Sequence, residues 1–187
     1  MGRTYDAVDD ALAAFLVRQP VFFTGTAPLG GDGHVSVSPK GLAGTFAVLG
    51  PSTVAYLDLT GSGVETIAHL RENGRITLMF CAFDGPPRIV RLMGRGEVVL
   101  ASDPRFEELS AVFPTLDGAR SVIVVELDRI ADSCGYGVPE MTLVGDRTRL
   151  LEWAGRKGVD GIAAYQREKN ARSIDGLPGL THDDAVT

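Results

Sequence analysis

The chain has 187 residues and a formal net charge of -6, with ordinary proportions of charged and hydrophobic residues. This length suffices for one domain with a sizeable core, and the acidic balance argues against nucleic acid or an anionic membrane surface as the main partner. No apolar run approaches the roughly 20 residues that span a bilayer, and the N-terminus lacks the apolar core of a signal peptide, so we expect a cytoplasmic protein.

Short strand-like segments dominate the first two thirds of the chain. An amphipathic helix is predicted over residues 5–18 and is ended by Pro20. Strands are predicted over residues 21–26, 34–38, 46–49, 53–59, 76–80, 88–100 and 121–127, with turns rich in glycine and proline between them. Only short helices, over residues 65–73 and 104–112, interrupt them. The pattern predicts a mainly β (α+β) protein in which about six or seven antiparallel strands close into a barrel with peripheral helices.

The last part of the chain has a different, helical character. From Arg147 onward, apolar residues recur at helical spacing in two stretches that Gly158 separates. We therefore expect a barrel domain with its N-terminal helix over residues 1–133. Residues 134–187 are predicted to form a helical extension that packs on the barrel or on a partner subunit.

A glycine-rich turn, Thr60-Gly61-Ser62-Gly63, connects the strand over residues 53–59 to the helix that opens at Glu65. Its glycines allow close approach of the backbone to a ligand, and its hydroxyls, with that of Thr66, add donors. The N-terminal end of the helix adds partial positive charge, so the turn is suited to an anion such as phosphate. The same residues also fit an ordinary strand-to-helix turn in which Ser62 is the helix cap.

A second polar segment, His34-Val-Ser-Val-Ser-Pro-Lys-Gly41, precedes this turn in the sequence. Strict alternation places His34, Ser36 and Ser38 on one face of a strand, with Lys40 just past its end. Lys40 would supply the cation that a phosphate on the glycine-rich turn needs, because hydrogen bonds to charged groups are the stronger ones. A solvated barrel face is the alternative interpretation.

The remaining polar groups give weaker signals. His69 lies four residues after Glu65, so the two share a helix face, and we interpret them as a surface pair, with a general acid/base role as the alternative. Cys81 ends an apolar strand and is expected to be buried, whereas Cys134 and Tyr136 lie in a turn-rich segment. No cluster has metal-ligand spacing, so no metal site is predicted.

Together with Arg-Ile-Val-Arg-Leu-Met-Gly-Arg-Gly at residues 88–96, these segments resemble the FMN-binding split-barrel proteins of the pyridoxamine 5'-phosphate oxidase-like superfamily. The resemblance covers residues 20–130 and lies in the order of the motifs. Ser-Pro-Lys follows a strand, and then come a strand containing tyrosine, the turn, a short helix and Arg-Ile-Thr-Leu-Met-Phe. It implies a split barrel, a homodimer with FMN at the subunit interface, and a flavin-dependent oxidoreductase acting on a small molecule.

The resemblance also implies which residues hold the flavin. Lys40 falls where the family places a phosphate-contacting lysine, and the strand that carries Tyr56 and Asp58 falls where one passes the isoalloxazine. The turn corresponds to the phosphate loop, and Arg88 lies on a strand that reaches the flavin from the other side. The predicted cofactor-binding residues are Ser38, Lys40, Tyr56, Asp58, Thr60, Gly61, Ser62, Gly63, Thr66 and Arg88. No catalytic side chain is assigned.

Departures from the oxidase argue against oxidation of pyridoxamine phosphate. The turn is followed by Val64-Glu65-Thr66 where the oxidase has two successive cations. Arg147-Thr148-Arg149 lacks the histidine of the oxidase's Arg-x-His, and Gly176-Leu177-Pro178 replaces its closing Arg-Leu-x-Pro.

Two other functions remain open at this stage. One is a deazaflavin-dependent reductase of the same fold, whose basic channel would draw on Arg88, Arg91 and Arg95. The other is a non-enzymatic module that binds flavin or haem, with His34 or His69 as the axial ligand. For the homodimer, Val122, Val124 and Leu127 lie on a strand with few charges and are predicted to form the interface.

Overall fold

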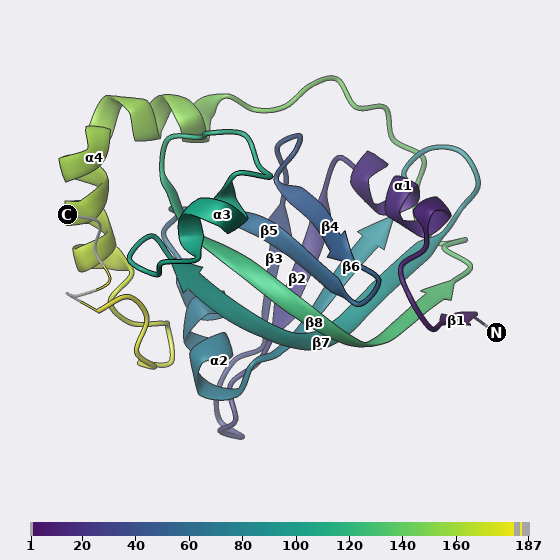
Figure 1. Ribbon diagram of the computed structural model, residues 1–187, viewed down its shortest axis with the longest axis horizontal. Coiled ribbons are helices and arrows are strands. Elements are labelled where there is room, and N and C mark those ends of the chain that lie inside the picture. Colours follow the sequence, from purple (N-terminus) through teal and green to yellow (C-terminus); the bar gives the residue numbers. More distant parts are fainter. Residues whose placement is uncertain (1, 182–183, 185–187) are drawn as a thin grey trace.

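One antiparallel sheet forms the body of the protein (Figure 1). The structure is a computed structural model that describes residues 2–181 and 184. The eight strands of the sheet are β1 (Thr4–Tyr5), β2 (Phe22–Thr26), β3 (Ser36–Lys40), β4 (Phe46–Gly50), β5 (Thr53–Leu59), β6 (Arg75–Cys81), β7 (Ile89–Leu100) and β8 (Ala119–Ser133). The order across the sheet is β3-β2-β6-β7-β8-β5-β4, and β1 pairs with one end of β8. The protein therefore has the predicted split-barrel architecture, with β3 and β4 as the edges.

Four helices surround this sheet: α1 (Asp10–Arg18), α2 (Glu65–Asn73), α3 (Phe106–Ser110) and α4 (Arg149–Lys169). The bounds of α2 are those expected, and Gly74 ends it in the left-handed region at φ 70°. The predicted break at Gly158 is present inside α4, where that residue has φ 62° and ψ 179°. None of the described helices combines the length and the apolar character that a membrane span requires.

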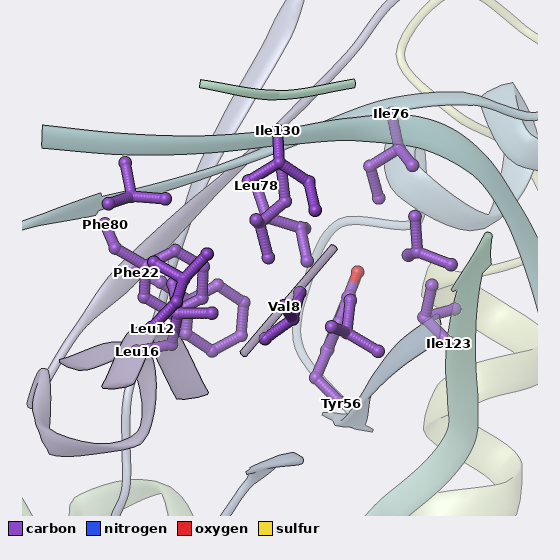
Figure 2. Close-up of a cluster of buried hydrophobic side chains, with 14 of the residues drawn as sticks. Val8, Leu12, Leu16, Phe22, Tyr56, Ile76, Leu78, Phe80, Ile123 and Ile130 are labelled. Atoms are coloured by element: carbon purple, nitrogen blue, oxygen red, sulfur yellow. The ribbon is translucent and has the colours of Figure 1, made fainter. Parts of the chain in front are cut away.

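Aromatic side chains join the two halves of the sheet where hydrogen bonds do not. Phe22 on β2 lies 5.4 Å from Phe46 on β4 and 5.5 Å from Tyr56 on β5, measured between ring centroids. Phe80 on β6 stacks on Phe22 at 5.1 Å. Figure 2 shows Phe22 and Phe80 beside Leu12 and other α1 side chains, within the main buried cluster. Because β2 and β4 lie far apart in the strand order, this packing joins the two halves of the sheet around a shared core although their edges are not hydrogen-bonded.

Several local predictions need correction. The sheet has eight strands rather than six or seven, and its hydrogen bonding leaves β3 and β4 unpaired with each other, so the barrel is not closed. The first helix begins at Asp10, because the Asp9 carboxylate accepts a hydrogen bond from the amide of Leu12 and caps it. Tyr5, predicted as the first residue of the helix, lies instead in β1, which pairs with Ile130 and Ala131 of β8, a long-range contact that a local pattern does not reveal.

The prediction that Val122 lies at a dimer interface also needs correction. Val122 is 0% exposed and packs within the chain against Leu57, Val99 and Phe113. Val124 and Leu127 are partly buried against the chain's own core clusters. Val122 therefore has no surface left for a partner subunit, because it points into this core, whereas an interface at the partly exposed Val124 and Leu127 stays a prediction.

We expect Phe22→Ala to lower the free energy of unfolding by about 3–5 kcal/mol, because it removes the ring that joins the two halves of the sheet. Val37→Ala on edge strand β3, where the side chain is 66% exposed, should change it by less than about 0.5 kcal/mol. Urea denaturation of both variants measures the difference. Equal effects would show that the aromatic contact does not hold the barrel closed.

Candidate functional site

A buried carboxylate, Asp58 on β5, lies at the centre of the most extensive polar network. Its side chain has no solvent exposure and contacts two cations, one on the adjacent strand β8 and one on the edge strand β3. Arg120 of β8 donates from Nε to Asp58 Oδ2 at 2.6 Å, and Lys40 of β3 donates from Nζ to Oδ1 at 3.1 Å. Asp58 thus links β5 to β3 across the open side of the sheet, where the edge strands β3 and β4 are not paired.

Two cations keep this buried carboxylate ionised. Burial by itself would raise the pKa of Asp58, but the charges of Arg120 and Lys40 outweigh it and lower that pKa from 3.8 to about 2. Two cations and one anion leave an excess of one positive charge at neutral pH. Lys40 carries the part of this charge that is nearest to solvent, since its side chain is 19% exposed.

The glycine-rich turn is held from behind by the end of α4. Arg120 also donates from Nη1 to the carbonyl oxygen of Gly63 at 3.0 Å. Asn170, directly after α4, donates to the carbonyl oxygen of Gly61 at 2.9 Å, and Gln166 donates to Thr60 Oγ1 at 2.8 Å. These contacts fix the backbone of the turn from the C-terminal side of the molecule.

A cavity of about 570 Å³ opens on the other side of Lys40 and the turn. Its polar lining comes from Lys40, Thr60, Gly61, Asp146 and Arg147. The rest of its lining is Val21, Pro39, Gly41, Leu42, Leu57, Leu59, Gly145 and Leu150. Gly61 is in open space, because a Cβ placed there would meet no atom within 4 Å. The cavity therefore combines a cation and a glycine-flanked turn with largely apolar walls.

The structure brings together only part of the predicted set. Lys40, Thr60 and Gly61 line this cavity. Asp58 lies behind Lys40, and Tyr56 has its ring in the core, with Lys40 Nζ 5.8 Å from the ring centroid. Both side chains are thus placed to support Lys40 rather than to touch a ligand in the cavity.

The other half of the turn faces the C-terminal segment. Thr66 is buried, and Val64 packs against Leu180. The carboxylate of Glu65 accepts a hydrogen bond from the amide of Ile174 at 3.3 Å. The N-cap position of α2 is Val64, with no side-chain cap bond, so Ser62 does not make the predicted cap. The N-terminus of α2 is covered by the chain itself and does not open into the cavity.

Arg88 and Ser38 lie outside this cavity. The Arg88 guanidinium donates to the Tyr5 hydroxyl at 2.7 Å and lies 3.4 Å from Asp132. It lines a second cavity of about 450 Å³ together with Cys134 and Tyr136, both exposed. Ser38 is on the half-buried face of β3, and its carbonyl oxygen accepts from the Thr24 hydroxyl at 3.3 Å.

His69 is not the surface residue that its spacing from Glu65 predicted. Its side chain has no solvent exposure, and its Nδ1 lies 2.9 Å from the Thr26 hydroxyl. Burial lowers the pKa of His69. The helix face shared with Glu65 packs against β2 and the C-terminal segment, so the interpretation as a solvent-exposed pair is wrong.

Sequence reasoning missed the residues that organise this site: Arg120, Gln166 and Asn170. Arg120 precedes the apolar run Ser-Val-Ile-Val-Val at the start of β8, and a cation beside so apolar a strand signals a buried partner. No comparable signal marks Gln166 or Asn170, because their partners lie 106 and 109 residues earlier in the chain.

Comparisons with known proteins agree with the split-barrel fold and identify the family. Residues 8–134 match the pyridoxamine 5'-phosphate oxidase family. A pyridoxamine 5'-phosphate oxidase family protein of Aspergillus flavus, ustO, is 46% identical over 192 residues, which cover 94% of this chain and 77% of that protein. The chain belongs to the pyridoxamine 5'-phosphate oxidase family.

Solved structures share the fold at low sequence identity. HupZ of Group A Streptococcus superposes with a TM-score of 0.51 at 17% identity, covering 65% of this chain and 90% of that one. A variant of the same protein gives 0.53 at 16% identity, over 67% of this chain and 99% of the other. Both cover about two thirds of the chain, as the family match does.

We expect Asp58→Asn to lower the free energy of unfolding at neutral pH by about 3–5 kcal/mol, because it leaves the Arg120 guanidinium buried without its anion. The control is Glu97→Gln, which breaks the exposed pair that Glu97 makes with Arg105 at 2.6 Å and should change stability by no more than about 1 kcal/mol. Urea denaturation measures both.

The contribution of Asp58 to the free energy of unfolding should also depend on pH. A carboxylate whose pKa is depressed from 3.8 to about 2 stabilises the fold above pH 4 and loses this contribution as the pH falls towards 2. The stability difference between wild type and Asp58→Asn should therefore shrink over that range. A difference that stays constant down to pH 2 would contradict an ionised Asp58.

Proposed function

We propose that the protein is an FMN-dependent oxidoreductase that binds its flavin at a homodimer interface and acts on a small molecule. The observation that carries this proposal is the ammonium group of Lys40 at the wall of a largely apolar cavity of about 570 Å³. Membership of the family supports it, because the resemblance described above implies a phosphate-contacting lysine at this position.

The residues of the cavity fit the chemistry of FMN. The flavin carries a phosphate monoester at one end and a planar, largely apolar ring system at the other. Lys40 and the hydroxyl of Thr60 are donors for the phosphate, and Arg147 offers a second cation on the same wall. Leu57 and Leu59 on β5 present apolar surface for the ring.

Bound flavin would supply hydride transfer, and the protein's part would be binding, orientation and exclusion of water. Lys40 would hold the phosphate, while the apolar side chains of β5 would keep water from the ring. Asp146 is the one carboxylate among the described residues that line the cavity, so few side chains there are available for proton transfer.

Two observations favour FMN over the alternative cofactors. Neither His34 nor His69 is among the described residues that line the cavity, which leaves haem without an axial ligand there. Along β7, Arg91 donates to Ser133 and Arg95 donates to the carbonyl oxygen of Asn73. These arginines have separate local partners, whereas a deazaflavin would need them in one basic channel.

A dimer would bring Arg88 to the flavin. In one chain Arg88 and Lys40 line different cavities, so contact of both with one flavin requires two subunits. The extended segment 137–148, which crosses the outside of the barrel from β8 to α4 (Figure 1), also supports association. It exposes Met141, Leu143 and Val144, apolar side chains that a second subunit would cover.

FMN should bind the purified protein, and Lys40→Ala should weaken this binding by about 1.5–3 kcal/mol, the usual worth of a hydrogen bond to a charged group. Quenching of flavin fluorescence on titration measures the affinity. Lys157→Ala, whose ammonium lies 5.5 Å from the Trp153 ring centroid on α4, is the matched control and should bind as wild type does.

Titration with riboflavin tests whether Lys40 acts on the phosphate or on the ring of the flavin. Because it lacks the phosphate, its affinity should be the same for wild type and Lys40→Ala. Absence of FMN binding by the wild type would overturn the proposed function. Equal FMN affinity for wild type and Lys40→Ala would remove Lys40 from the site.

Mixed dimers test the arrangement across subunits. If Lys40 of one subunit and Arg88 of the other hold the same flavin, a dimer of Lys40→Ala and Arg88→Ala subunits contains one intact site and one doubly altered site. It should bind FMN tightly at half the wild-type stoichiometry, while each variant homodimer binds weakly. Two equally weakened sites in the mixed dimer would place both residues in one subunit's site, and a monomer by light scattering would refute the dimer.

A further inference from the structure

A continuous series of polar contacts joins the two ligand-facing parts of the cavity through the interior of the protein. Lys40 contacts Asp58 at 3.1 Å, and Asp58 contacts Arg120 at 2.6 Å. Arg120 donates to Asn170 Oδ1 at 2.9 Å, and Asn170 Nδ2 donates to the carbonyl oxygen of Gly61 at 2.9 Å. Lys40 and Gly61 both line the cavity, whereas the three residues between them are at most 6% exposed.

Asn170 is the residue that closes this series. Its side chain accepts from a guanidinium and donates to a carbonyl at the same time, a combination that an amide provides and a carboxylate does not. Its backbone is fixed as well, because its amide bonds to the carbonyl oxygen of Gln166 and its carbonyl oxygen accepts from the amide of Leu180. Asn170 thus joins α4 and the C-terminal segment to the turn.

We propose that Arg120 and Asn170 are positioning residues of the Lys40 cavity, which couple ligand binding there to docking of the C-terminal segment. The identity of the ligand rests on the proposed function, but the positioning does not. Arg120 keeps Asp58 in place as the anchor of Lys40, and Asn170 sets the backbone of Gly61. A chain in which residues 170–180 are undocked would keep its barrel but bind an anionic ligand weakly.

The charges at Asp58 make the role of Arg120 measurable. The groups that face this carboxylate are Lys40 from β3, Arg120 and the Ser121 hydroxyl from β8, and the Tyr56 ring from β5. In Arg120→Met, an ionised Asp58 would neutralise Lys40 and remove the excess positive charge. Protonation of Asp58 at lower pH would then return that charge to the cavity, so binding of an anion should recover on acidification.

The first experiment compares Arg120→Met with Arg120→Lys. The ratio of the FMN dissociation constant of each variant to that of wild type is measured from pH 8 to pH 5, which cancels titration of the ligand's own phosphate. Arg120→Met should show a ratio of about ten or more at pH 8 that falls towards one at pH 5. Arg120→Lys keeps the positive charge, so its ratio should not change with pH. A ratio for Arg120→Met that is independent of pH would overturn the role assigned to Arg120.

The second experiment tests Asn170 in the unliganded protein. Amide hydrogen exchange at Gly61 and Ser62 should be faster in Asn170→Ala than in wild type, and FMN affinity should fall about tenfold. Asn170→Asp keeps the acceptor for Arg120 but loses the donor to Gly61, so exchange in the turn should rise in this variant too. The control is Lys169→Ala, whose ammonium pairs with Glu168 on the surface and which should change neither quantity. Unchanged exchange and affinity in Asn170→Ala would overturn the coupling.

These readouts separate this proposal from the proposed function. Failure of wild type to bind FMN would remove the assigned function, while exchange in the turn of the unliganded protein would still show whether Asn170 positions it. Tight FMN binding by wild type and by both altered Asn170 proteins would keep the function and overturn the coupling. If Arg120→Met does not fold, as judged by circular dichroism, Arg120→Lys tests the same residue: it lacks the forked donors to Asp58, Gly63 and Asn170, so amide exchange at Gly61 and Ser62 should rise, and unchanged exchange would overturn the role of Arg120.

Discussion

The burial of one carboxylate determines how this end of the molecule is assembled. Asp58 has no access to water, and an ionised group in that position is tolerated only when cations and hydrogen bonds replace its hydration. Arg120 and Lys40 meet that requirement from two different strands, and Arg120 in turn engages Asn170 beyond α4. Strand β3, the glycine-rich turn and the C-terminal segment are therefore placed relative to each other by the need to compensate a single charge.

The split in the barrel explains why the cavity is where it is. A sheet closed by hydrogen bonds would pair its edge strands β3 and β4, whereas here side chains alone join the two sides of the opening. Phe22 and Phe46 meet on the inside of the barrel, and Lys40 reaches Asp58 towards the end of the gap. The cavity lies beside this second contact, and Lys40, Leu57 and Leu59 are among the residues that line it. The same gap that leaves the sheet open thus leaves room for the cavity.

The cations at the cavity come from parts of the chain other than the residues that follow the glycine-rich turn. The turn is followed by Val64-Glu65-Thr66, and the C-terminal segment covers the N-terminus of α2. Positive charge reaches the cavity instead from Lys40, supported by Arg120, and from Arg147 in the segment that leads to α4. Asn170 and Arg147 both belong to the C-terminal third of the chain. This part of the chain therefore holds the backbone of the turn through Asn170 and lines the cavity through Arg147.

The sequence by itself predicted seven of the eight strands, the position of α2 and the break at Gly158, and it singled out Lys40 and Gly61, which line one cavity. These follow from local periodicity, from glycine conformation and from an ordered set of motifs. Only the tertiary structure decided that His69 is buried, that the N-terminus of α2 is covered, and that Arg120 joins Asp58 to Asn170. The reason is physical: the sequence pattern of an element shows which of its faces is apolar, but not which distant segment packs on it. The partners of Arg120 lie 62 residues before it and 50 after it, and burial arises only when those segments meet.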